Sequence, residues 1–150
     1  MTPETPPLQR AAVDQIVVFF ETLSPQSLDH LATVYSADAY FKDPFNEVQG
    51  IAEIQRIFRH MYVALDTPHF VVTGRVVDGD HCFLTWEFRF KFRRLSTQVN
   101  QVVRGVSHLQ LTPEGRIHTH RDYWDAAEEL YEKLPLLKHL MHWLKRQINR

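Results

Sequence analysis

The strongest constraint on the fold is a stretch of alternating side chains over residues 81–93. Every second residue is apolar, and the residues between them are mostly polar or charged. A period of two is typical of a β-strand that buries one face and exposes the other. The apolar side chains are Cys82, Leu84, Trp86, Phe88, Phe90 and Phe92. A sheet that contains this strand needs a second layer over its apolar face.

Three amphipathic segments earlier in the chain supply that layer. Apolar residues recur at spacings of three and four over residues 8–23, which predicts a first helix. Ser24 and Pro25 predict the start of a second helix, because serine caps helices and proline suits their first position. The apolar face of that helix is expected to hold Leu28, Leu31, Ala32 and Tyr35. A third helix runs from Gly50 to Leu65, again with an apolar stripe.

The rest of the sequence predicts a sheet. The expected strands are residues 39–42, 69–77, 81–93, 97–111 and 116–124, and a final helix begins near residue 126. Helices followed by long strands indicate an α+β fold, with a curved, mostly antiparallel sheet wrapped around the helices. We expect a single domain over residues 8–150, after a Pro-rich, disordered lead-in at residues 1–7.

Composition excludes several classes of function. Lys and Arg number 17 against 18 Asp and Glu, and a net charge of -1 gives no general attraction to nucleic acid. Cys82 is the only cysteine, which excludes an internal disulfide and a multi-cysteine zinc site. No apolar run reaches the roughly 20 residues of a membrane span, and the start lacks a signal-peptide pattern. We therefore expect a soluble, cytoplasmic protein.

The last predicted strand holds the candidate site. Side chains alternate between the two faces of a strand. One face would carry His118, His120, Asp122 and Trp124. Burying such groups costs several kcal/mol unless they are paired. We therefore expect Asp122 to be mostly buried and hydrogen-bonded to His120, Tyr62 or an ordered water.

Three segments carry a resemblance to a known family: Tyr35–Pro44, Gly50 at the start of the third helix, and Gln110–Asp125. In this order they resemble the nuclear transport factor 2-like superfamily, which includes ketosteroid isomerases, limonene epoxide hydrolase and SnoaL-like polyketide cyclases. The resemblance implies a cone-shaped α+β barrel, with three N-terminal helices in the concave face of the sheet and a C-terminal helix. It also implies an apolar pocket inside the cone and a homodimer formed through the sheet.

The sequence departs from the catalytic residues of ketosteroid isomerases. Asp43 matches the position of their general base. Their two oxyanion donors correspond to Phe19, which has no donor, and to Ser107, which is a weak one. Steroid isomerisation is therefore not expected.

The sequence also departs from limonene epoxide hydrolase. Asp122 matches a catalytic aspartate there. The Arg-x-Asp pair that completes that triad becomes Glu87-x-Arg89 or Trp86-x-Phe88 in this chain. Epoxide hydrolysis by the same arrangement is therefore not supported.

We expect an aromatic pocket with few polar groups, because burying the rings of residues 81–93 contributes about 25 cal/mol per Å². The expected catalytic residues are Asp122 as general acid–base, His120 holding or sharing its proton, and Asp43 as a second carboxylate. The expected ligand contacts are Trp86, Phe88, Phe90, Phe19, Tyr62, Ser107 and Trp124. His118 would lie near the rim.

Two functions from different classes remain open. In the first, the protein is an enzyme of isomerase, cyclase or hydrolase type that uses no cofactor and acts on a small apolar molecule. Alternatively, it is a non-catalytic ligand-binding or dimerisation module, in which Asp43 caps a loop and His120 is a hydrogen-bonded core histidine. We do not expect a metal. His118 and Asp122 lie about 13 Å apart along an extended strand, too far for one ion, so only an adjacent pair with a residue from elsewhere, such as Asp43, could bind one.

The C-terminal segment is apolar on one side and basic on the other. Pro135 predicts that it forms a short helix followed by a second one. The apolar stripe is Leu137, Leu140, Met141, Leu144 and Ile148. We favour a lid over the cone or an oligomer contact, and we do not favour the alternative of contact with an anionic membrane surface.

Overall fold

The computed structural model describes residues 7–93, 100–129, 142–144 and 146–148. The helices are α1 (Pro7–Glu21), a 3-10 helix η1 (Gln26–Thr33), α2 (Ile51–Ala64) and α3 (Ala126–Glu129). The strands are β1 (Tyr35–Lys42), β2 (Glu47–Gln49), β3 (Leu65–Asp78), β4 (His81–Phe92), β5 (Gln101–Leu111) and β6 (Ile117–Tyr123). The predicted lead-in up to residue 6 and most of the predicted C-terminal helix lie outside the described residues.

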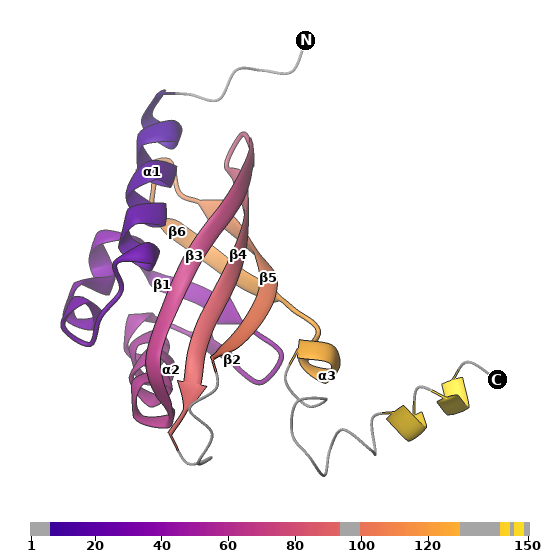
Figure 1. The fold of residues 1–150 in the computed structure, drawn as a ribbon. Coiled ribbons are helices and arrows are strands. Elements are labelled where there is room, and N and C mark those ends of the chain that lie inside the picture. The colour runs from indigo at the N-terminus through magenta and orange to yellow at the C-terminus, as the bar shows by residue number, and fades with distance from the viewer. Residues whose placement is uncertain (1–6, 94–99, 130–141, 145, 149–150) are drawn as a thin grey trace.

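The strands form one curved, unclosed sheet in the order β2-β1-β6-β5-β4-β3. Neighbouring strands are antiparallel, except that β1 and β6 are parallel. Figure 1 shows α1, η1 and α2 gathered along one side of this sheet, with the long β3, β4 and β5 curving past them. The predicted α+β fold is therefore confirmed. Within the described residues, no helix is long and apolar enough to span a bilayer.

The core forms where the helices meet the apolar face of the sheet. Ile16 and Phe20 on α1 and Ile54 and Phe58 on α2 are buried there. On β4, the predicted alternation holds: Cys82, Leu84, Trp86 and Phe90 are buried, whereas Phe83, Thr85 and Arg89 are exposed. The aromatic face of β4 therefore points towards the helices, as the burial argument requires.

Several elements differ from the sequence prediction in type or extent, and β3 begins at Leu65 and not at residue 69. The second helix is a short 3-10 helix with non-helical backbone angles at His30. Tyr35 begins β1 and does not belong to that helix, and its inward face continues with Ala39 and Phe41. Strand β2 was not predicted, because its three residues show no apolar alternation.

A β-bulge in β6 changes the face of one predicted site residue. Ile117 pairs with Leu111 and Thr119 pairs with Gln110, so His118 is an extra residue between two consecutive pairs. The bulge lets Ile117 and His120 both point inward, and the side chain of His118 is 49% exposed. The prediction that His118 shares the inward face with His120 and Asp122 is therefore wrong.

Candidate active site

Two cavities lie between the helices and the sheet. The larger has a volume of about 490 Å³ and the smaller about 30 Å³. Four residues line both of them: Phe58, Phe70, Trp86 and Asp122. The smaller cavity has room for one or two water molecules, and the larger has the size of a small-molecule site.

The large cavity has mostly aromatic walls. The rings come from β1, the β1–β2 loop, α2, β3, β4 and the residue that follows β6. They are Phe41, Phe45, Phe58, Phe70, Trp86, Phe88, Phe90, Phe92 and Trp124. The polar residues of the lining are Asp43, Asn46, Arg56, His60 and Asp122.

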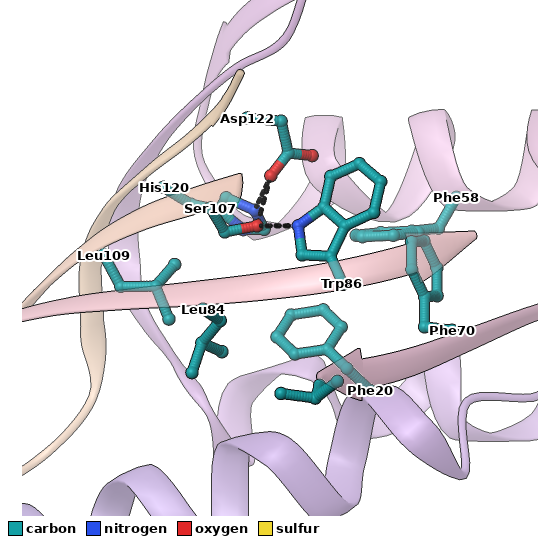
Figure 2. Close-up of a pocket in the computed structure, with 10 residues that line it drawn as sticks. Phe20, Phe58, Phe70, Leu84, Trp86, Ser107, Leu109, His120 and Asp122 are labelled. Atoms are coloured by element: carbon teal, nitrogen blue, oxygen red, sulfur yellow. Dashed lines mark hydrogen bonds and ion pairs between the residues drawn. The ribbon is translucent and has the colours of Figure 1, made fainter. Parts of the chain in front are cut away.

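A chain of hydrogen bonds runs across four adjacent strands at the smaller cavity. We call its five members the Asp122 network: Tyr35, His120, Asp122, Ser107 and Trp86. The Tyr35 hydroxyl lies 2.6 Å from His120 Nδ1, and His120 Nε2 lies 2.7 Å from Asp122 Oδ1. Ser107 donates to the same oxygen at 2.5 Å and accepts a hydrogen bond from Trp86 Nε1 at 2.9 Å. Figure 2 shows the carboxylate of Asp122 above Trp86, with one oxygen directed towards His120 and Ser107.

The network favours one arrangement of protons. Burial raises the pKa of Tyr35 well above its usual value, and the negative charge of Asp122 adds to this effect. Tyr35 therefore keeps its proton, and its hydroxyl can donate a hydrogen bond to His120 Nδ1. The other ring nitrogen of His120 then carries the hydrogen that is donated to Asp122. Among the described residues, nothing forms a hydrogen bond with the second carboxylate oxygen, Oδ2, so that oxygen is free to accept a proton.

A model of the SnoaL-like domain family matches residues 16–120, more than half of the chain. The chain belongs to the SnoaL-like family. A search of curated proteins finds no significant match to this SnoaL-like chain.

Several solved structures share the fold of this SnoaL-like protein. A putative SnoaL-like polyketide cyclase from Jannaschia sp. CCS1 is 14% identical, with a TM-score of 0.70 over 83% of this chain and 92% of that one. A hypothetical protein with a ketosteroid isomerase-like fold from Catenulispora acidiphila DSM 44928, in complex with trimethylamine, is 18% identical, with a TM-score of 0.66 over 85% of this chain and 92% of that one. An LEH-like epoxide hydrolase from M. tuberculosis is 17% identical, with a TM-score of 0.64 over 85% and 89%. At these identities the likeness shows the fold alone.

Most of the predicted site residues meet at the two cavities of the SnoaL-like domain. The carboxylate of Asp122 is bonded to His120, as predicted, and the side chain is 17% exposed. Ser107 lines the small cavity and Trp86 lines both. The remaining aromatic candidates, Phe88, Phe90 and Trp124, line the large cavity. Their roles with a ligand stay predictions.

Phe19 and Tyr62 line neither cavity. Phe19 is partly buried, and its helical neighbour Phe20 is the side chain that reaches the small cavity and the ring of His120. The ring of Tyr62 packs against the core, and its hydroxyl has no hydrogen-bond partner among the described residues. The structure therefore places neither residue where a ligand in these two cavities would touch it.

Tyr35 is the network residue that the sequence prediction missed as part of the site. It is fully buried and stacks on His120 with 6.0 Å between ring centroids. The period of two in Tyr35, Ala39 and Phe41 is the signal that could have placed it on the inward face of a strand.

Asp43 lines the large cavity but is engaged in a turn. Its Oδ1 accepts hydrogen bonds from the backbone amides of Phe45 (2.8 Å) and Asn46 (2.6 Å). The side-chain amide of Asn46 lies 3.2 Å from both carboxylate oxygens. These bonds match the loop-capping explanation of Asp43.

Asp43→Asn is expected to lower the free energy of unfolding by about 1 kcal/mol, because hydrogen bonds to a charged acceptor are stronger than those to a neutral one. Urea denaturation measures this difference. Asp38→Asn is the matched control, because Asp38 is exposed and lies outside both cavities. An Asp43→Asn protein as stable as wild type would contradict the capping role.

The described part of the chain offers no evident metal centre. Within it, no group of three or more His, Cys, Asp or Glu side chains is placed to hold a metal ion.

Proposed function

We propose that this SnoaL-like protein is a cofactor-independent acid–base enzyme that acts on a small apolar molecule in the large cavity. One observation carries the proposal. Among the described residues, Asp122 is the only ionisable residue that lines both cavities. One of its oxygens is held by His120 and Ser107, and the other is free.

The network orients the carboxylate for proton transfer. Two donors fix Asp122 Oδ1, and both are fixed in turn, His120 by Tyr35 and Ser107 by Trp86. Asp122 Oδ2 is thus held in one position beside the aromatic walls, where it can take a proton from a bound molecule and return it. A positioned acid–base group of this kind typically contributes about 10²–10⁴-fold to a rate.

The relatives support a site for small molecules. They are described as a putative polyketide cyclase, an epoxide hydrolase-like protein and a protein in complex with trimethylamine. Each description concerns that protein. Together they support the proposal that this chain uses the same fold to hold a small molecule against Asp122.

A probe reaction tests the proposal without knowledge of the natural substrate. 5-Nitrobenzisoxazole is a neutral, apolar molecule whose ring opens when a base removes its C–H proton, and the phenol that forms is coloured. The wild-type protein is expected to open the ring faster than an equal concentration of acetate.

The second candidate function is a binding module without catalysis. It is favoured by the side chains that stand at the hydrolase positions, since Glu87 and Arg89 form an ion pair with each other at 2.7 Å. Binding of the probe with no acceleration of ring opening would support this candidate.

We also propose that the protein is a cytoplasmic homodimer that associates through the outer face of the sheet. That face carries the exposed rings of Phe83 and Tyr123. It also carries the charged side chains that we expect to form pairs across the interface: Glu87, Arg89, Lys91 and Arg104. Sedimentation at micromolar concentration is expected to show a dimer, and Phe83→Glu is expected to shift it towards monomer. A wild-type monomer at that concentration would reject this mode of association.

A further inference from the structure

The large cavity combines aromatic walls with an excess of negative charge. Its acidic lining residues are Asp43 and Asp122, and its basic ones are Arg56 and His60. The guanidinium of Arg56 pairs with Glu53, which lies outside the lining, at 3.1 Å. Arg56 is thus shared with a third carboxylate, and the negative charges near the cavity outnumber its one guanidinium.

Some donors and acceptors in the cavity lining already have hydrogen-bond partners, and others do not. Among the donors of the lining, Asn46 donates to Asp43, Trp86 donates to Ser107, and Nε and Nη2 of Arg56 donate to Glu53. The indole N–H of Trp124 has no hydrogen-bond partner among the described residues. His60 is an exposed residue of α2. The acceptor Asp122 Oδ2 also has no hydrogen bond within the described part of the chain. Beside Phe70 and Trp86, the cavity therefore suits a ligand that donates a hydrogen bond to Asp122 Oδ2.

The rings around Asp122 suit a positive charge. The face of an aromatic ring is electron-rich and attracts cations, most strongly when water is excluded. Phe70 stacks on Phe88 with 4.4 Å between centroids and meets Trp86 edge-on at 5.9 Å. Phe70 and Trp86 line both cavities together with Asp122.

We infer that the ligand of this cavity is a cationic amine with apolar substituents, whose nitrogen lies beside Asp122 among Phe70, Phe88 and Trp86. This inference rests on the proposed function and refines it: the small molecule of this site is apolar in its carbon groups and carries one positive charge at nitrogen. A protonated tertiary amine meets each condition: its N–H donates to Asp122 Oδ2, its charge faces the rings, and its carbon groups fill the apolar volume.

Two probes of equal shape separate charge from apolar burial. N,N-Dimethylbenzylamine is protonated at pH 7, and isobutylbenzene is its neutral carbon analogue. Each is titrated into the full chain while tryptophan fluorescence is recorded, because Trp86 and Trp124 line the cavity. The amine is expected to bind about tenfold tighter, or more, than the hydrocarbon.

Two pairs of variants locate the source of that preference. Asp122→Asn is expected to weaken amine binding about tenfold and to change isobutylbenzene binding by less than about twofold. Asp38→Asn removes an exposed carboxylate outside the cavity and is expected to change neither. Phe88→Leu is expected to weaken the amine more than the hydrocarbon, whereas Phe83→Leu, at an exposed position of the same strand, is expected to affect neither. Circular dichroism checks that each variant is folded, and the Phe88 pair still decides if Asp122→Asn does not fold.

The possible failures are distinguishable. Equal binding of the two probes, or tighter binding of isobutylbenzene, would overturn the amine inference and leave the proposed small-molecule site standing. Binding of neither probe would overturn both. An amine preference that persists in Asp122→Asn or in Phe88→Leu would overturn the position assigned to the nitrogen.

Discussion

Asp122→Asn is expected to slow the opening of 5-nitrobenzisoxazole by about 10²–10⁴-fold, because it removes the group that accepts the proton. The fold is expected to survive. The amide oxygen of asparagine can accept the same hydrogen bonds from Ser107 and His120, and the amide nitrogen takes the place of Oδ2. The substitution therefore separates the reacting group from the structural role of the network.

The measurement is the value of kcat/KM for wild type and variant, with the thermal melting temperature of each. Asp38→Asn is the control for a general change of charge and is expected to match wild type. A stable Asp122→Asn protein that opens the probe at the wild-type rate would show that Asp122 is not the base. A similar loss in Asp43→Asn would mean that both carboxylates act.

Gly105→Ala is expected to disturb both the stability and the site. Gly105 on β5 pairs with Trp86 on β4, and a Cβ at this position would come within 2.5 Å of Cζ2 of the indole. The indole must then move from its place and lose its bond to Ser107. Overpacking of this kind typically lowers the free energy of unfolding by about 1–3 kcal/mol. The rate of probe opening is also expected to fall, because Ser107 loses the indole N–H that orients it.

Gly74→Ala is the matched control. An added Cβ there would meet only the hydroxyl oxygen of Thr85, at 2.9 Å. A change in χ1 of this exposed side chain relieves the contact and loses its hydrogen bond to Thr73. The expected change in unfolding free energy is about 1 kcal/mol or less, and the indole of Trp86 is not displaced. Chemical denaturation and the tryptophan emission maximum measure both variants. If Gly105→Ala keeps the wild-type stability and emission, the close contact between strand and indole does not hold Trp86 in place.

Much of this fold could be predicted from the periodicity of the sequence. The alternation on β4 fixed which side chains face the helices, since a strand with one apolar face has only one favourable orientation. The outline of α1 and α2 followed from their apolar stripes. The 3-10 geometry of η1 and the short β2 could not be predicted from a local pattern. The first depends on how the chain packs between α1 and β1, and the second on its pairing with β1.

The candidate site was only partly predictable for the same reason. Parity along the last strand placed Asp122 and His120 on the inward face, and the structure brings them within hydrogen-bonding distance. The prediction from alternation was wrong at His118, because a β-bulge inserts one extra residue there and the sequence gives no signal for a bulge at this position. The bond between Tyr35 and His120 joins residues 85 positions apart, so it depends on the parallel pairing of β1 with β6.

A crystal structure with 5-nitrobenzotriazole, a ring of similar shape that cannot open, tests the central claim most directly. The account predicts that the ring lies in the large cavity with a nitrogen about 2.6–3.2 Å from Asp122 Oδ2, the distance at which a proton can be transferred. Asp122 Oδ1 should keep its bonds to His120 and Ser107. A ring bound elsewhere, or one in the cavity with no contact to Asp122, would contradict the assignment of this carboxylate as the reacting group.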